Sequence, residues 1–303
     1  MSTVEKAAEK LKKLPADPPV SQAAAAAPEP AVPLHAAPTV ERLQERTRVA
    51  APPAETAAPW HIDLAALKRM GLLPADREAE LRLADELRRI KRPLLENAMG
   101  KGAETFVRGK RILVTSAQPN EGKTFTAINL AMSLARETDF EVLLVDGDIP
   151  KADITRVLGL VGKPGLMDVV ADEHRNPVEV ILRTDVANLL VVPAGERHPL
   201  AAELFRGRRM EYVLDELGGR NPRRLVVFDS SPLLATSESE VLASHVGQVV
   251  MVVAADRTRR QAVQSALKSL NALQYVGLVL NMSRLSEGDN YYGGYHEFLS
   301  RDR

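Results

Sequence analysis

The chain has no cysteine among its 303 residues, few aromatic residues and no net charge. The lack of cysteine excludes disulfide bonds, thiolate metal sites and thiol catalysis. Forty basic residues balance 40 acidic ones, which gives no electrostatic basis for a nucleic-acid partner. The longest apolar runs, such as VVMVVAA, have the length of a strand, whereas crossing a bilayer takes about 20 residues. We therefore expect a cytoplasmic protein.

The N-terminal part of the chain also has too little apolar bulk for a core. Residues 15 to about 60 are rich in alanine and proline, and repeated prolines block a continuous helix. We predict that residues 1–60 form a disordered segment. The first 14 residues are compatible with a short helix, which we expect to fray.

Helical periodicity begins after Trp60. The stretch IDLAALKRMG predicts a short helix that ends at Gly71. A longer helix follows, and Pro93 should kink or split it. Its apolar face is spaced at i, i+4, i+7 and i+11 and consists of Leu83, Leu87, Ile90 and Leu94. We assign residues 61–101 to a helical segment that precedes the main domain at 102–285.

The main domain alternates apolar strands with helical segments. The predicted strands are 111–116, 142–146, 189–192, 225–229, 249–254 and 276–281, and the clearest helices begin after Lys123 and cover 208–217 and 259–273. Nearly continuous aliphatic runs indicate strands that are buried on both faces of a parallel sheet. This pattern predicts a doubly wound, mostly parallel α/β fold of the P-loop NTPase type, with ligands at the carboxyl ends of the strands.

A phosphate-binding motif follows the first strand. Ala117 to Thr124 reads A-x-x-x-x-G-K-T, a P-loop in which alanine replaces the first glycine. Such a loop turns backbone N–H groups toward phosphates, its lysine reaches the β- and γ-phosphates, and its hydroxyl serves Mg²⁺. The residues assigned to ATP binding are Gln118, Pro119, Asn120, Glu121, Gly122, Lys123, Thr124, Phe125 and Asn281.

Two further strands end in carboxylates. VLLVDGD ends in Asp146 and Asp148, and LVVFD ends in Asp229. A single aspartate at a strand end is commonly a turn or capping residue, but three on neighbouring strands favour a metal site. We expect Thr124 and these aspartates, foremost Asp229 and either Asp146 or Asp148, to form a Mg²⁺ site.

These motifs together resemble the bacterial tyrosine kinases of exopolysaccharide export. The resemblance rests on SAQPNEGKT, VLLVDGDIPKADI, the stretch 225–234 and a C-terminal tyrosine cluster, and it covers roughly residues 60–297. DELRRIKRPLLENAMGK and VLASHVGQVVMVVAADRTRRQAV resemble more narrowly the exosortase-associated tyrosine autokinases. The resemblance implies a protein-tyrosine autokinase that uses ATP and Mg²⁺ and regulates exopolysaccharide polymerisation and export.

The resemblance also implies residue roles. It selects Thr124, Asp146 and Asp229 for the Mg²⁺ site. Lys123, Asp146 and Asp148 match catalytic positions, and Asp148 matches the aspartate that helps to activate the incoming tyrosine. Glu86, Arg89 and Arg92 reproduce E-x-x-R-x-x-R, which in relatives holds subunits in a ring. Two departures stand out: Lys151 replaces an arginine that often follows the two aspartates, and two serines and one proline follow Asp229 where the family frequently has D-x-P-P.

Partners follow from the same resemblance. Relatives without membrane spans work with a membrane-embedded chain-length protein, or co-polymerase, that activates them and recruits them to the inner face of the plasma membrane. A cognate tyrosine phosphatase is a further implied partner, whereas nucleic acid is not.

The C-terminal tail, 286–303, contains three of the five tyrosines in the chain: Tyr291, Tyr292 and Tyr295. Glycines in this polar stretch keep the backbone free, so we expect the tail to be flexible and its tyrosines to be the phosphate acceptors. Tyr212 and Tyr275 lie in periodic segments, where we expect them to be packed. Reach alone leaves transfer in cis and in trans both open.

Two alternatives use the same fold. A ParA/MinD-type ATPase switch carries a signature lysine five residues before the P-loop lysine, and here that position is Gln118. A nucleotide-sensing partner without catalysis would not need the intact lysine, threonine and three aspartates.

Overall fold

The structure is a computed structural model that describes residues 58–102, 106–219, 221–270 and 275–283. All of them belong to one compact unit, Pro52–Arg303. The predicted disorder of the N-terminal segment, apart from residues 58–60, and the predicted flexibility of the tail lie outside the described residues.

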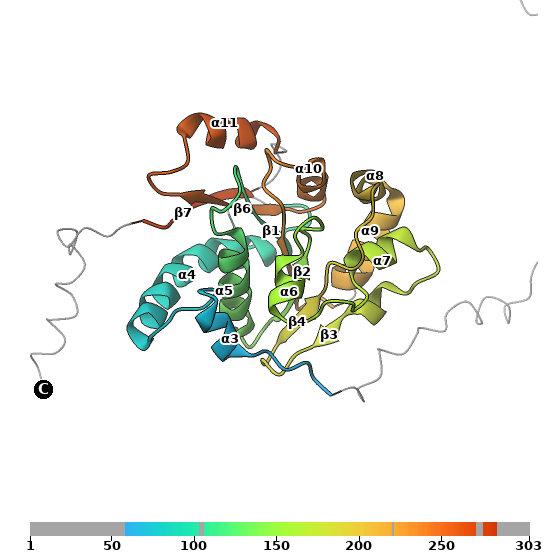
Figure 1. Cartoon of the computed structure of the whole chain (residues 1–303), viewed down its shortest axis with the longest axis horizontal. Helices are drawn as coiled ribbons and strands as arrows, with labels where there is room; N and C mark the ends of the chain where they lie inside the picture. The colour runs from blue at the N-terminus through green and yellow to red at the C-terminus, as the bar shows by residue number, and fades with distance from the viewer. Residues whose placement is uncertain (1–57, 103–105, 220, 271–274, 284–303) are drawn as a thin grey trace, which may run out of the picture. The chain divides into compact units, whose positions relative to one another are not determined.

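A seven-stranded sheet forms the centre of the unit (Figure 1). Its spatial order is β3-β4-β2-β5-β1-β6-β7, and β3 alone among these strands runs antiparallel. The strands are β1 Arg111–Ser116, β2 Glu141–Asp146, β3 Leu182–Arg183, β4 Leu189–Val192, β5 Arg224–Asp229, β6 Gln248–Ala254 and β7 Tyr275–Asn281. The six predicted strands are confirmed to within one residue, and the mostly parallel α/β class is confirmed.

Side chains alternate between the two faces of the sheet. In β1, Leu113 packs in one hydrophobic cluster, whereas Ile112 and Val114 pack in the other. Val226 and Phe228 of β5 belong to the first cluster, while the alternate positions of that strand belong to the second. This two-sided burial is why the strands read as continuous apolar runs rather than as an alternating pattern.

Helices cover both faces, as a doubly wound fold requires (Figure 1). One face carries α3 Leu64–Arg69, α4 Arg77–Ala98, α5 Lys123–Ala135 and α6 Asp153–Val157. The other carries α7 Leu166–Ala171, α8 Ala201–Arg206, α9 Arg208–Leu214, α10 Ser237–Ser244 and α11 Arg260–Lys268. Short 3₁₀ and π turns occur at η2 Pro177–Val180 and η3 Asp215–Gly219.

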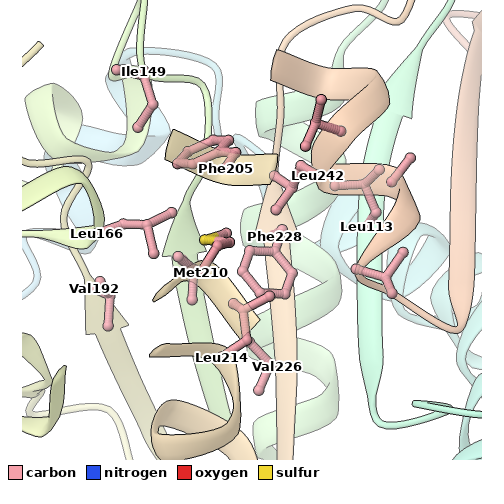
Figure 2. Close-up of a cluster of buried hydrophobic side chains, with 14 of the residues drawn as sticks. Leu113, Ile149, Leu166, Val192, Phe205, Met210, Leu214, Val226, Phe228 and Leu242 are labelled. Atoms are coloured by element: carbon pink, nitrogen blue, oxygen red, sulfur yellow. The ribbon is translucent and has the colours of Figure 1, made fainter. Parts of the chain in front are cut away.

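Aromatic side chains fill the centre of the second face. Figure 2 shows Phe228 from β5 beside Met210 of α9, with Phe205 of α8 and Leu242 of α10 in the same cluster. Phe205 and Phe228 are both completely buried. Burying rings of this size stabilises the domain by about 1.5–3 kcal/mol each relative to leaving them exposed.

Some local predictions need correction. The predicted helix 208–217 ends at Leu214, where the chain passes into the π turn. Tyr212 on α9 was predicted to be packed but is 47% exposed, because Met210 and Val213 supply the buried side of this short helix. Tyr275 is partly buried and packs edge-on against Phe106, as expected.

Helix α4 runs through Pro93 without being split. Leu87 and Leu94, on either side of the proline, are buried against the sheet, and Leu83 and Ile90 pack beside them. A proline inside a helix removes one backbone hydrogen bond, and this packing compensates for the loss. The predicted apolar face of α4 is confirmed.

A buried glutamine fastens α4 to the sheet. The Gln248 side chain at the start of β6 donates to the carbonyl oxygens of Leu94 (3.0 Å) and Gly109, and it accepts from the amide of Asn97 (3.0 Å). Gln248 is fully buried, so these partners cannot be replaced by water without opening the interface.

We predict that Gln248→Ala lowers the free energy of unfolding by about 2–4 kcal/mol, because it leaves buried polar groups without partners. Thermal and urea unfolding measure the loss. The matched control is Gln264→Ala on the exposed side of α11, which should change stability by less than about 0.5 kcal/mol. Equal effects of the two substitutions would contradict the role assigned to Gln248.

Candidate active site

The P-loop lies between β1 and α5, as predicted. Lys123 is the first residue of α5, and Gly122 precedes it in a left-handed conformation with φ 93°. Asn120 also has a positive φ, 62°. These conformations turn the backbone of the loop, and the N-terminus of α5 presents unpaired N–H groups of the kind that bind phosphate.

The three predicted aspartates meet at the carboxyl edge of the sheet. Asp146 of β2 is the register partner of Asp229 of β5, and Asp229 in turn pairs with Val114 of β1, the strand that leads into the P-loop. Asp148 follows β2 by two residues. All three carboxylates are at least 99% buried.

Each carboxylate has one oxygen that is held and one that is not. The hydroxyl of Thr124 donates to Oδ2 of Asp229 (2.7 Å). The hydroxyl of Ser231 donates to Oδ1 of Asp148 (2.6 Å). The other oxygens, Oδ1 of Asp146, Oδ2 of Asp148 and Oδ1 of Asp229, are buried without a hydrogen-bond partner in the part of the chain that the structure describes.

These orphaned oxygens fit a divalent cation with few protein ligands. Within the described ranges, no group of three or more His, Asp or Glu side chains could hold a metal by itself. Mg²⁺ in nucleotide sites is bound through one or two carboxylates together with phosphate oxygens and water, so this result agrees with a metal that arrives with a nucleotide.

Burial also changes the titration of two aspartates. Desolvation raises the pKa of Asp229 to about 8, against the opposing hydrogen bond from Thr124. It raises the pKa of Asp146 to about 6, with hydrogen bonds from Thr155 opposing the rise. Lys123 is also buried and favours the charged form of Asp229, but a second cation would stabilise both carboxylates further.

Asn281 at the end of β7 holds the P-loop from the opposite side. Its Nδ2 donates to the carbonyl oxygen of Glu121 (2.9 Å). The carboxylate of Glu121 accepts from the backbone N–H of Gln118 (2.7 Å) and from the hydroxyl of Thr258. Glu121 is therefore a buried brace of the loop, while Gln118 and Pro119 are exposed on its outer surface.

The other predicted site residues are distributed over the surface. Glu86, Arg89 and Arg92 are all exposed on α4, away from its buried face, and Arg92 pairs with Glu96 (3.1 Å). The tail tyrosines Tyr291, Tyr292 and Tyr295 lie outside the described residues.

Three contributors were missed from the sequence. Thr155 of α6 donates both its N–H (2.8 Å) and its hydroxyl (2.7 Å) to Asp146. Ser231 holds Asp148, and Thr258 holds Glu121. Ser231 carried a signal, since it occupies the first proline position of the frequent D-x-P-P, whereas threonines in loops and short helices carry none.

Comparisons with known proteins agree with this geometry. No family model matches the chain. The chain is 27% identical over 196 residues to the tyrosine-protein kinase YwqD of Bacillus subtilis, covering 63% of this chain and 81% of YwqD. It is 26% identical over 197 residues to the tyrosine-protein kinase CpsD of Streptococcus agalactiae, covering 64% of this chain and 83% of CpsD.

Solved structures share the architecture. The crystal structure of the VpsO kinase domain is 28% identical, with a TM-score of 0.50, and the match covers 58% of this chain and 85% of that one. The chimeric protein CapA2B2 superposes with a TM-score of 0.59 over 76% of this chain and 95% of its own, and its 22% identity makes this a likeness of fold alone.

The chain is similar to bacterial tyrosine kinases over about two thirds of its length. Its enzyme class is that of a protein-tyrosine kinase. The narrower likeness to the exosortase-associated autokinases stays a prediction. No helix in the described part of this kinase is long and apolar enough to cross a membrane.

We predict that Gly122→Ala weakens ATP binding by at least about tenfold. An added Cβ would lie 2.0 Å from Nδ2 of Asn281, and the left-handed φ of 93° disfavours any side chain. Titration with a fluorescent ATP analogue measures the effect.

Two matched variants identify the cause. Gly71→Ala carries a comparable φ of 70° with no atom within 4 Å, so it should leave binding unchanged. Gly122→Ala combined with Asn281→Ala should recover part of the affinity, because truncation removes the clashing amide. Normal binding by Gly122→Ala alone would show that the loop does not need this close approach.

The raised pKa values predict a falling stability with rising pH. A carboxyl group whose folded pKa exceeds its unfolded value stabilises the protein at low pH, and this contribution is lost as pH rises through the folded pKa. In EDTA without nucleotide, the free energy of unfolding and the melting temperature should fall between about pH 6 and pH 8, where Asp229 is protonated in the folded state and ionised in the unfolded one. The limiting slope for one group is about 1.4 kcal/mol per pH unit, and the decline should level off as Asp229 ionises above pH 8.

Asp229→Asn should flatten this decline, whereas Asp139→Asn at an exposed position should not. Addition of Mg²⁺ and ATP should flatten it in the wild type. The same slope in wild type and in Asp229→Asn would assign the pH dependence to other groups.

Proposed function

We propose that this kinase transfers the γ-phosphoryl group of ATP to tyrosines in the C-terminal tail of a second copy, within a ring, and thereby regulates exopolysaccharide polymerisation and export. The observation that carries the proposal is the convergence of Lys123, Thr124 and three buried aspartates at one edge of the sheet, with one oxygen of each aspartate unpartnered among the described residues. That arrangement suits a nucleotide and its metal.

The roles of the residues follow from their chemistry. ATP with Mg²⁺ supplies the phosphoryl donor and compensates its charge. Lys123 neutralises charge on the phosphates, and Thr124 together with Asp229 and Asp146 provides the oxygen ligands for the metal. A transition state of this kind needs positioning and electrostatic compensation more than covalent help from the protein.

Asp148 is suited to receive the proton of the attacking tyrosine. Its Oδ1 is held by Ser231, which fixes the carboxylate, and its Oδ2 carries no hydrogen bond from any described residue. A positioned carboxylate within hydrogen-bond reach of a tyrosine hydroxyl can accept its proton as the bond to phosphorus forms.

Assembly into a ring is supported by the exposed face of α4. Glu86, Arg89 and Arg92 point away from the core, and the helix itself is fixed by Gln248 and by the buried Leu87 and Leu94. A rigid helix with exposed charges of both signs can present a defined pattern to a neighbouring subunit. We extend the proposal to a membrane-embedded co-polymerase as activator, which would recruit the kinase to the membrane, and to a cognate tyrosine phosphatase.

The kinase assignment is favoured over the ATPase switch by two observations. The curated relatives named above are tyrosine-protein kinases. The position of the switch class's signature lysine is occupied here by Gln118, which is exposed and turned outward on the P-loop.

A mixing experiment tests transfer between copies. The first chain carries Lys123→Met, which should bind its neighbours but transfer no phosphate. The second carries Tyr291→Phe, Tyr292→Phe and Tyr295→Phe, which removes the acceptor hydroxyls and keeps the rings. Each chain alone with ATP and Mg²⁺ should remain unlabelled, and the mixture should carry phosphotyrosine on the Lys123→Met chain, as measured by mass mapping.

The exposed Tyr212 supplies the control. Tyr212→Phe should leave labelling unchanged, since this tyrosine is accessible but lies on α9 within the folded domain. Label that persists on the tail-substituted chain alone would identify another acceptor. A mixture that stays unlabelled while the wild type labels itself would indicate transfer within one chain, and phosphotyrosine on the Lys123→Met chain alone would contradict the kinase assignment.

A further inference from the structure

A cleft lies beside Asp146 and Asp148. It has a volume of about 420 Å³ and lies between the α6 region, the loop before α7 and the loop after β4. The cationic side chains that line it are Lys151, Arg156, Lys163, Arg175 and Arg197, and the carboxylates are Asp168 and Glu196. We call this set of residues the basic cleft.

The two carboxylates do not balance the cations. The carboxylate of Asp168 is held by the backbone: its Oδ2 accepts a hydrogen bond from the N–H of Gly165 (2.7 Å) at the start of α7. Asp168 keeps its charge, so five exposed cations face two carboxylates in the cleft. Asp153 and Asp172 beside it pair with Arg156 and Arg175, which leaves a small positive excess. The basic cleft therefore has a positive potential suited to an anionic ligand.

The interactions of Lys163 and Arg175 within the structure are weak. Lys163 lies over the ring of Trp60 at 5.3 Å, and Arg175 is 3.7 Å from the exposed carboxylate of Asp172. Contacts between exposed charges of this kind contribute about 0–1 kcal/mol, so a ligand can replace them at little cost.

Residues in the wall of the basic cleft contact the active-site aspartates. Ala152 and Thr155 line it, and Thr155 donates to Oδ2 of Asp146 through its N–H and its hydroxyl. Lys151, whose backbone N–H also bonds the carbonyl of Asp148 (3.0 Å), lines it as well. A peptide that brings a tyrosine to Asp148 would therefore pass its neighbouring residues over this surface.

The tail sequence is complementary to this surface. Residues 285–299, LSEGDNYYGGYHEFL, contain Glu287, Asp289 and Glu297 and no lysine or arginine. Asp289 lies two residues before Tyr291, and Glu297 lies two residues after Tyr295. In an extended peptide, residues i and i+2 point to the same side about 7 Å apart, so an acidic side chain would accompany each acceptor.

The distance across the sheet limits which part of the chain's own tail can reach the basic cleft. Five strand spacings separate β7 from β4 in the order of the sheet, about 24 Å. Asp289 is six residues beyond Ser283, a span of roughly 13 Å as a flexible chain and about 20 Å when fully extended. The Asp289–Tyr291 pair of the same chain is therefore poorly placed for the basic cleft, whereas Glu297, 14 residues beyond Ser283 and about 48 Å away when fully extended, is within reach. The choice of a second copy rests on the proposed function.

We propose that the basic cleft binds the acidic residues that flank the acceptor tyrosines of a second copy, and so selects acidic tyrosine peptides as substrates. The inference rests on the proposed function. It assigns Lys163 and Arg175 to substrate selection rather than to chemistry.

Peptide binding tests the inference independently of catalysis. Fluorescence anisotropy is measured with three peptides of residues 285–299: the natural one, one with Glu287→Gln, Asp289→Asn and Glu297→Gln, and one with lysine at these three positions. The protein is the full-length chain with the three tail Tyr→Phe substitutions. A non-hydrolysable ATP analogue and Mg²⁺ are present in the binding buffer. We expect the natural peptide to bind about tenfold more tightly than the neutral one, with a preference that shrinks as salt rises.

Charge reversal at Lys163 and Arg175 tests whether these two residues bind the acidic peptide. Lys163→Glu with Arg175→Glu should abolish this preference and bind the lysine peptide more tightly than the wild type does. The matched control, Lys68→Glu with Lys268→Glu at exposed positions of α3 and α11, should keep the preference for the natural peptide. Thermal unfolding checks that both variants are folded, and their ATP hydrolysis without peptide should equal that of the wild type.

Two outcomes overturn the inference: equal binding of the natural and neutral peptides by the wild type, or an unchanged preference in the reversed variant. Phosphate transfer is then measured with the same peptides. Transfer without a charge preference removes the inference and leaves the proposed function standing. A charge preference in binding without any transfer removes the proposed function and leaves the basic cleft as a peptide site.

Discussion

The register between β2 and β5 places two carboxylates, Asp146 and Asp229, directly opposite each other inside the protein. Two buried like charges at adjacent strand ends are unfavourable, and burial accordingly raises the pKa of both. Lys123 offsets part of this cost from the neighbouring P-loop. The rest of the site is arranged so that a ligand with positive charge completes it.

This arrangement links ligand binding to stability. The hydrogen bonds from Thr124, Thr155 and Ser231 orient the three carboxylates but leave one oxygen of each without a partner among the described residues. Such groups cost free energy in the protein without nucleotide. Binding of the proposed nucleotide and metal would remove this cost and so stabilise the folded state.

The sequence predicted the sheet well because β1, β2, β4, β5 and β6 are buried on both faces. Strands of this kind appear as apolar runs of four to seven residues, and their ends mark the edge where ligands bind. The edge strand β7 exposes Leu278 and Leu280 but carries a similar aliphatic run. The antiparallel β3 has two residues and no such run, so it could not be found. Tyr212 was misplaced because helical periodicity in a seven-residue helix does not fix which side is buried.

The site could be predicted as far as its charged residues. Lys123 and the three aspartates occupy motif positions, whereas the residues that orient them come from distant parts of the chain. Thr155 reaches Asp146 because α6 packs beneath β2, and Thr258 reaches Glu121 across 137 residues of sequence. These contacts depend on tertiary packing that no short motif encodes.

The serine at position 231, in place of the first proline of D-x-P-P, has a structural consequence. A proline at the position of Ser231 could not donate a side-chain hydrogen bond, whereas Ser231 donates to Asp148 at 2.6 Å. The substitution therefore adds a constraint on the carboxylate that we assign to proton transfer.

The helical segment 61–101 is joined by hydrogen bonds to α5, the helix that follows the P-loop. Asn129 on α5 donates to the carbonyl oxygen of Leu72 (2.8 Å), in the turn that follows α3, and α5 begins at Lys123. Lys91 of α4 donates to the carbonyl oxygen of Ser133 on α5 (3.2 Å) and pairs with Glu137 (2.6 Å). The helix that carries the proposed subunit contacts is thus fastened to the helix that carries the phosphate-binding lysine. If a neighbouring subunit binds α4 as proposed, these contacts with α5 would provide a route from the subunit interface to the P-loop.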